Sequence, residues 1–170
     1  MISIGFRASP DAVHYAVVAE EADASLVRTV SAVVMPLALH LPEQLAFMRT
    51  TLLDVIGEYG ADCAGIRTTE PIVKPHVVRT SIEGVIQELL ASGAVATYCA
   101  GPIATIRSLL KIKPAGAVLE YIKGEKEYPG TTNWAKYKAE QREAILIAMS
   151  ALRVRAPRYV PLFASGEQAT

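Results

Sequence analysis

The stretch "LPEQLAFMRTTLLDVIGEYGADCAGI" (residues 41–66) predicts a helix followed directly by a strand. Over its first two thirds, apolar residues recur at steps of three and four, the period of an amphipathic helix. Pro42 stands near the start, where its missing N–H costs nothing. Gly60 stands just after the last apolar residue, where glycine commonly ends a helix. The short apolar run at 62–68 then predicts a buried strand.

Three further strands are predicted before this stretch. The runs at 1–9, 13–20 and 26–35 are rich in alternating or β-branched residues. The polar segments "SPDA" and "EADAS" join them as short turns. Short turns between strands are typical of an antiparallel meander.

The chain after residue 70 alternates helices with one strand. We expect a helix over 77–89 that is closed by Gly93, a strand over 94–100 and a short helix from Pro102. Residues 111–130, which mix glycine and proline with charged residues, predict a flexible loop or hairpin. The segment "NWAKYKAEQREAILIAMSALR" predicts a long final helix with Asn133 as its cap.

This order predicts an α/β fold: a mixed five-stranded sheet, made of an antiparallel three-strand meander plus parallel strands, flanked by helices. The length fits one domain, which we place at residues 1–153. The C-terminal tail at 154–170 has two prolines and no period. It either packs on one edge of the sheet or is partly disordered.

The composition is that of a globular protein, with 51% hydrophobic residues. No apolar run approaches the roughly 18 residues that span a bilayer, and since residues 1–20 show no basic segment before an apolar run, we expect no signal peptide. Cys63 and Cys99 lie in apolar runs and predict buried thiols rather than a metal site. We therefore expect a cytoplasmic protein without membrane contact.

The charges are unevenly distributed along the chain. Residues 1–106 hold six Lys/Arg against eleven Asp/Glu, whereas residues 107–170 hold eleven against six. Such asymmetry hints at an anionic partner such as nucleic acid, although taken alone it is better explained by a solvated basic face. The sequence contains no G-x-G-x-x-G motif and no P-loop.

Three segments resemble the RuvC-type Holliday-junction resolvases of the RNase H-like superfamily. They are the opening stretch, "GVIQELLASGAVATYCAGPIATIRSLL" (84–110) and "EQREAILIAMSAL" (140–152). The resemblance spans residues 2–152 and implies an RNase H-like (RuvC-type) fold. It also implies DNA as the partner and a homodimer formed through the helix at 77–89.

The resemblance also implies a metal site that this chain has altered. Members of the family cut branched DNA with two metal ions held by four carboxylates. At the four matching positions stand Arg7, Arg67, Glu140 and Glu143. A guanidinium is always charged and cannot ligate a cation. We therefore expect no metal cofactor and no metal-dependent nuclease activity, with the two arginines paired to the two glutamates.

Two other interpretations stay open. In the first, the metal ligands have migrated, and Asp11, Glu70, Glu140 and Glu143 hold Mg²⁺ or Mn²⁺ in a divergent endonuclease. In the second, the protein is a scaffold subunit that makes protein contacts only.

The interpretation that we favour is a protein that binds structured or branched nucleic acid, DNA rather than RNA. Its candidate phosphate contacts are basic residues: Arg7, Arg67, Arg79, Arg107, Lys111, Lys113, Lys136 and Lys138. Trp134, together with Tyr137, is a candidate for base stacking. Each group has a plain alternative, namely structural salt bridges for the arginines, a solvated face for the lysines and core packing for the aromatic rings.

Overall fold

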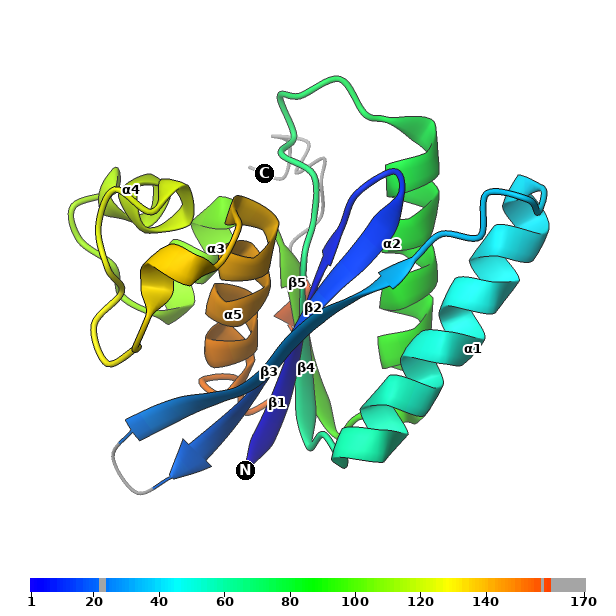
Figure 1. Ribbon diagram of the computed structural model, residues 1–170. Coiled ribbons are helices and arrows are strands. Elements are labelled where there is room, and N and C mark those ends of the chain that lie inside the picture. The colour runs from blue at the N-terminus through cyan, green and yellow to red at the C-terminus, as the bar shows by residue number, and fades with distance from the viewer. Residues whose placement is uncertain (22–23, 157, 160–170) are drawn as a thin grey trace, which may run out of the picture.

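The computed structural model describes residues 1–21, 24–156 and 158–159 (Figure 1). Its strands are β1 (Ile2–Ala8), β2 (Ala12–Glu21), β3 (Ala24–Val34), β4 (Cys63–Arg67), β5 (Thr97–Gly101) and β6 (Arg158–Tyr159). They form one sheet in the order β3-β2-β1-β4-β5-β6. The pairs β1–β2 and β2–β3 are antiparallel, whereas β1–β4, β4–β5 and β5–β6 are parallel.

Helices cover both faces of this sheet. They are α1 (Leu41–Tyr59), α2 (Val77–Leu89), α3 (Ile103–Leu109), α4 (Ala117–Lys123) and α5 (Ala139–Ala151), with a kinked turn at Leu90–Ala94, where Gly93 has φ 95°, and a 3₁₀ turn at Trp134–Lys136. Figure 1 shows α1 and α2 on one side of the sheet and α3, α4 and α5 on the other. Among the described residues, no helix is both long and apolar enough to cross a bilayer.

The predicted α/β fold is confirmed, because the three-strand meander and the two parallel strands lie where the sequence placed them. Gly60, in the left-handed conformation with φ 57°, ends α1 as expected. Of the C-terminal tail, residues 158–159 pair with β5 at the sheet edge as the sixth strand, so the edge-packing prediction is confirmed there. Residues 160–170 lie outside the described part of the chain.

The prediction of a flexible loop or hairpin over 111–130 was wrong, because this segment contains α4. Ala117, Val118 and Ile122 of α4 are buried in the apolar cluster around α5. Gly124, with φ 78°, ends the helix in the left-handed conformation. The sequence did not indicate this helix because its three buried apolar residues stand among many glycines, prolines and charged residues, so the helical period is weak. The helix is stabilised by packing against the apolar cluster.

The final helix begins at Ala139, six residues later than predicted. Asn133 has φ 56°, a left-handed conformation, and stands before the 3₁₀ turn rather than capping the helix. Trp134 is fully buried, and its Nε1–H donates to the Tyr121 carbonyl at 2.8 Å. Burial of this ring turns the chain inward, so α5 can start only after the extended residue Lys138.

Two glycines let α5 approach the centre of the sheet. Gly5 and Gly65 are register partners on β1 and β4, and both face α5. A Cβ on Gly5 would lie 2.1 Å from the Ala144 carbonyl oxygen, and one on Gly65 would lie 2.7 Å from the Ile147 carbonyl oxygen. No real Cβ fits at these distances, so the helix backbone rests directly on the two strands.

We expect the substitution Gly65→Ala to destabilise the protein by about 1–3 kcal/mol, since the new methyl group must push α5 away from the sheet. The matched control is Gly84→Ala in α2, where a Cβ has no neighbour within 4 Å. There the gain in helix propensity should stabilise by about 0.5–1 kcal/mol. Urea unfolding of both variants measures the difference, and equal midpoints would contradict the close approach.

Candidate functional site

Arg7 and Arg67 lie side by side in the sheet. They are register partners at the ends of the parallel strands β1 and β4, two residues beyond the Gly5–Gly65 pair. Side chains alternate along a strand, so both arginines project to the same face as the two glycines. That is the face covered by α5. The two positions that the resemblance assigned to metal-binding acids are therefore adjacent, as expected, and both are cationic.

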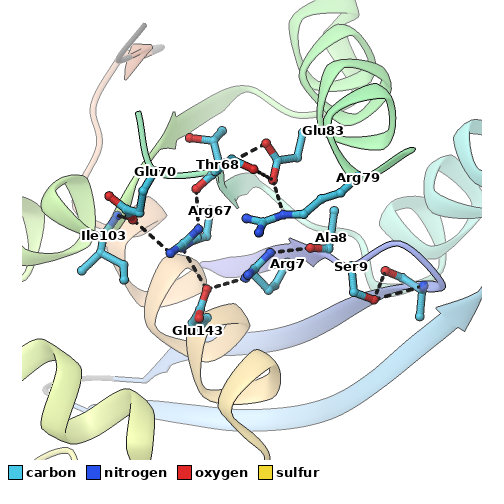
Figure 2. A network of polar contacts seen from close by, with 12 residues as sticks. Arg7, Ala8, Ser9, Arg67, Thr68, Glu70, Arg79, Glu83, Ile103 and Glu143 are labelled. Carbon is cyan, nitrogen blue, oxygen red and sulfur yellow. Dashed lines mark hydrogen bonds and ion pairs between the residues drawn. The ribbon is translucent and has the colours of Figure 1, made fainter. Parts of the chain in front are cut away.

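Glu143, in the first half of α5, pairs with both guanidinium groups (Figure 2). Arg7 Nε–H donates to Glu143 Oε2. Arg67 Nε lies 2.9 Å from the same oxygen, an ion-pair contact rather than an aligned hydrogen bond. Arg67 Nη2 also lies 3.0 Å from Glu70 Oε1. The predicted ion pairs of Arg7 and Arg67 with Glu143 are thus present.

These charges are largely removed from water. The side chains of Arg7, Arg67 and Glu143 are 11%, 6% and 10% exposed. Burial lowers the pKa of Arg67; the Glu143 carboxylate opposes this shift, and the neighbouring Arg7 adds to it. The Glu143 carboxylate lies between the two buried cations. Its attraction to them offsets the free-energy cost of removing the guanidinium groups from water.

A second ion pair extends the cluster to α2. Arg79 Nε donates to Glu83 Oε1 at 2.8 Å, and Glu83 also accepts from the backbone N–H and the hydroxyl of Thr69, at 2.9 and 3.0 Å. Burial lowers the pKa of Arg79, and the nearby Arg7 lowers it further. The chain just beyond β4 is thereby fastened to α2. The i, i+4 spacing of Arg79 and Glu83 could have revealed this pair from the sequence.

Glu140 does not share the role that was predicted for it. It lies half-buried in the first turn of α5 and forms no ion pair within the described residues. The prediction that it pairs with an arginine was wrong, and Glu143 receives both guanidinium groups. One turn of helix separates the two glutamates, and only the later one lies over the strand ends.

The alternative set of migrated carboxylates does not converge. Asp11 lies in the β1–β2 turn and accepts a hydrogen bond from the Ser9 hydroxyl at 2.6 Å. Glu70 Oε1 is engaged by Arg67 and by the Ile103 N–H, the latter at 2.9 Å. In the described part of the chain, no three Asp, Glu, His or Cys side chains come close enough to hold a metal ion. The donors of the proposed Mg²⁺ or Mn²⁺ site therefore do not fit such an ion.

Trp134 is a core residue and not a stacking platform. It has no exposed surface, and its ring packs 6.1 Å from Tyr128 and 6.3 Å from Tyr137, between ring centroids. The stacking role that was predicted for Trp134 is wrong, because a nucleobase cannot reach a buried ring. The alternative of core packing applies. Lys136 and Lys138, nearby, are exposed, and Lys136 Nζ lies 4.9 Å from the Tyr137 ring centroid.

Three other predicted cations gather on one surface. Arg107, Lys111 and Lys113 are exposed and line a hollow of about 490 Å³ at the end of α3. None of the three forms an ion pair within the described residues. A second hollow of about 330 Å³ shares Arg107 and Ala115 with the first and reaches Glu70. Sequence reasoning missed this second hollow, since α4 forms its far wall.

No protein-family model and no curated protein matches this sequence. Among solved structures, Thermus thermophilus RuvC is similar, with a TM-score of 0.65 at 13% identity over 90% of this chain and 94% of that chain. The T. thermophilus RuvC in complex with Holliday junction substrate gives a TM-score of 0.62 at 15% identity, with the same coverage. At this identity the likeness establishes the fold. The chain has the RuvC-type RNase H-like fold that the resemblance predicted.

We expect Glu143→Gln to destabilise the protein by about 3–5 kcal/mol, because it leaves buried Arg7 without a carboxylate partner and Arg67 with Glu70 alone. Glu140→Gln is the control and should change stability by less than about 0.5 kcal/mol. Chemical denaturation of the two variants tests this. In a site that gathers carboxylates to hold metal, neutralising one acid relieves repulsion, so a stabilised Glu143→Gln variant would contradict the arrangement described here.

Proposed function

We propose that this protein binds structured or branched nucleic acid and lacks metal-dependent nuclease activity. The lack of metal-dependent nuclease activity is inferred from the pairing of Glu143 with Arg7 and Arg67. In the family that this sequence resembles, carboxylates at these strand ends help to hold two metal ions. Here guanidinium groups take that place, and they repel divalent cations.

The binding half of the proposal is supported by the exposed cations on and after α3. Arg107, Lys111 and Lys113 have no carboxylate partner in the described residues, so phosphates can pair with them without breaking an ion pair. Arg7, Arg67 and Arg79, by contrast, are engaged by glutamates. We assign the main phosphate contacts to the α3 surface and a structural role to the arginine cluster.

The proposal of DNA, and of a four-way junction in particular, is supported by the resemblance to the RuvC-type resolvases. A structure of similar fold is a RuvC in complex with Holliday junction substrate, and we propose the same ligand class here. We also propose that two copies pair through α2. The scaffold alternative differs in one respect: it predicts no junction binding even at low salt.

A four-way junction should bind in EDTA, with an affinity that falls steeply as salt rises. The double variant Lys111→Gln/Lys113→Gln should weaken binding and reduce the slope of log K against log salt by about 2, through two lost phosphate contacts. The control, Lys123→Gln/Lys126→Gln, removes two exposed lysines that already face Glu125 and Glu120. Fluorescence anisotropy across a salt series measures both. Equal slopes in the two variants would contradict the assignment to α3.

The same junction should stay uncut in Mg²⁺ or Mn²⁺, because no cluster of acids converges among the described residues. Denaturing gels of end-labelled strands, with an active resolvase as positive control, provide the measurement. Metal-dependent cutting by the wild type that disappears in Asp11→Asn or Glu140→Gln would instead establish the migrated-carboxylate nuclease. Both residues are away from the buried ion pairs, so neither change should unfold the protein.

A further inference from the structure

The two hollows beside α3 differ in chemistry. The first is lined by the cations Arg107, Lys111 and Lys113. The second is lined chiefly by apolar side chains, with Glu70 at one end. Arg107 and Ala115 border both, so the two hollows are contiguous. A surface with a cationic part and an apolar part side by side matches a ligand that is itself divided into an anionic and a flat apolar group.

The apolar hollow has walls from two helices. Ile103 and Ala104 come from α3, and Val118 and Leu119 come from α4. Val118 is buried, whereas Leu119 is 45% exposed and presents its side chain to solvent. A volume of about 330 Å³ is of the size that small organic ligands occupy. Covering Leu119 and Ala104 with a planar ring would remove apolar surface from water.

Glu70 adds one polar acceptor group. Its Oε1 is fixed by the Ile103 N–H and Arg67, which holds the carboxylate in place. Neither of these contacts is to its Oε2, and the side chain is 28% exposed. A fixed carboxylate oxygen at the end of an apolar hollow accepts from an N–H donor, such as a nucleobase amino or imino group.

We propose that these contiguous hollows form a subsite for one unpaired nucleotide. Its phosphate lies over Arg107, Lys111 and Lys113, and its base lies against Ile103, Ala104 and Leu119 with an N–H directed at Glu70. A paired base cannot enter, because its Watson–Crick edge is already occupied. This inference rests on the proposed nucleic-acid binding and specifies its preference: DNA that carries a bulged or unpaired nucleotide.

The test compares three 30-base-pair duplexes: fully paired, with a single cytosine bulge, and with an abasic residue in the bulge. The wild type should bind the cytosine bulge about fivefold more tightly than the other two, a preference set by one buried base. The abasic bulge keeps the phosphate and the backbone distortion, so it separates base recognition from shape.

Leu119→Ser should abolish the preference for the cytosine bulge while leaving the salt dependence unchanged. Leu53→Ser is the matched control, because Leu53 of α1 is 41% exposed and is not part of either hollow. Both changes replace surface leucines on helices, and thermal melts verify that both variants fold.

The possible outcomes distinguish failure of the nucleotide subsite from failure of the proposed nucleic-acid binding. Equal binding of all three duplexes, or a preference that persists in Leu119→Ser, would overturn the subsite while leaving nucleic-acid binding intact. Absence of binding to any of the duplexes and to the four-way junction would overturn both. A cytosine-bulge preference lost in Leu119→Ser and kept in Leu53→Ser would establish the subsite.

Discussion

The direct contact between the α5 backbone and the middle of the sheet governs the rest of this molecule. Gly5 and Gly65 leave no side chain between the strands and the helix, and the Ser3 hydroxyl donates to the Ala148 carbonyl across the same junction at 2.7 Å. One turn before this contact, α5 carries Glu143. Two residues beyond the glycines, the strands carry Arg7 and Arg67. The glycine layer therefore sets the distance at which the carboxylate meets the two guanidinium groups.

The two arginines and the glutamate depend on each other. With both cations buried and adjacent, removal of Glu143 would leave Arg7 without a carboxylate partner and Arg67 with Glu70 alone. Replacing the whole cluster by apolar residues of equal volume need not lower stability, since a buried ion pair roughly breaks even against such a core. The cluster therefore fixes the register of β1, β4 and α5 rather than supplying a large net stabilisation.

The sequence predicted the parts of this arrangement that rest on local period. The position of the arginine pair was predicted from the resemblance, which places Arg7 and Arg67 at matching ends of two strands, and adjacent parallel strands bring equivalent ends together. The choice of Glu143 over Glu140 could not be foreseen, since it depends on the rotation of α5 about its axis. Trp134 and α4 were missed for a related reason: their burial comes from contacts between segments distant in sequence, which no periodic pattern records.

Arg142 shows how far such non-local contacts reach. It belongs to the part of the sequence with an excess of basic residues, yet it is buried and donates to the carbonyls of Ile122, Trp134 and Ala135 at 3.1–3.3 Å. A Cβ on Gly124 would lie 2.5 Å from its Cζ, so the segment after α4 wraps closely around this guanidinium. Arg142 and Glu143 are consecutive residues of α5. Arg142 holds the segment that carries α4, and Glu143 forms the buried ion pairs. Since α4 forms a wall of the apolar hollow, the surface that we assign to nucleotide binding is held in place by the same helix that carries Glu143 to Arg7 and Arg67.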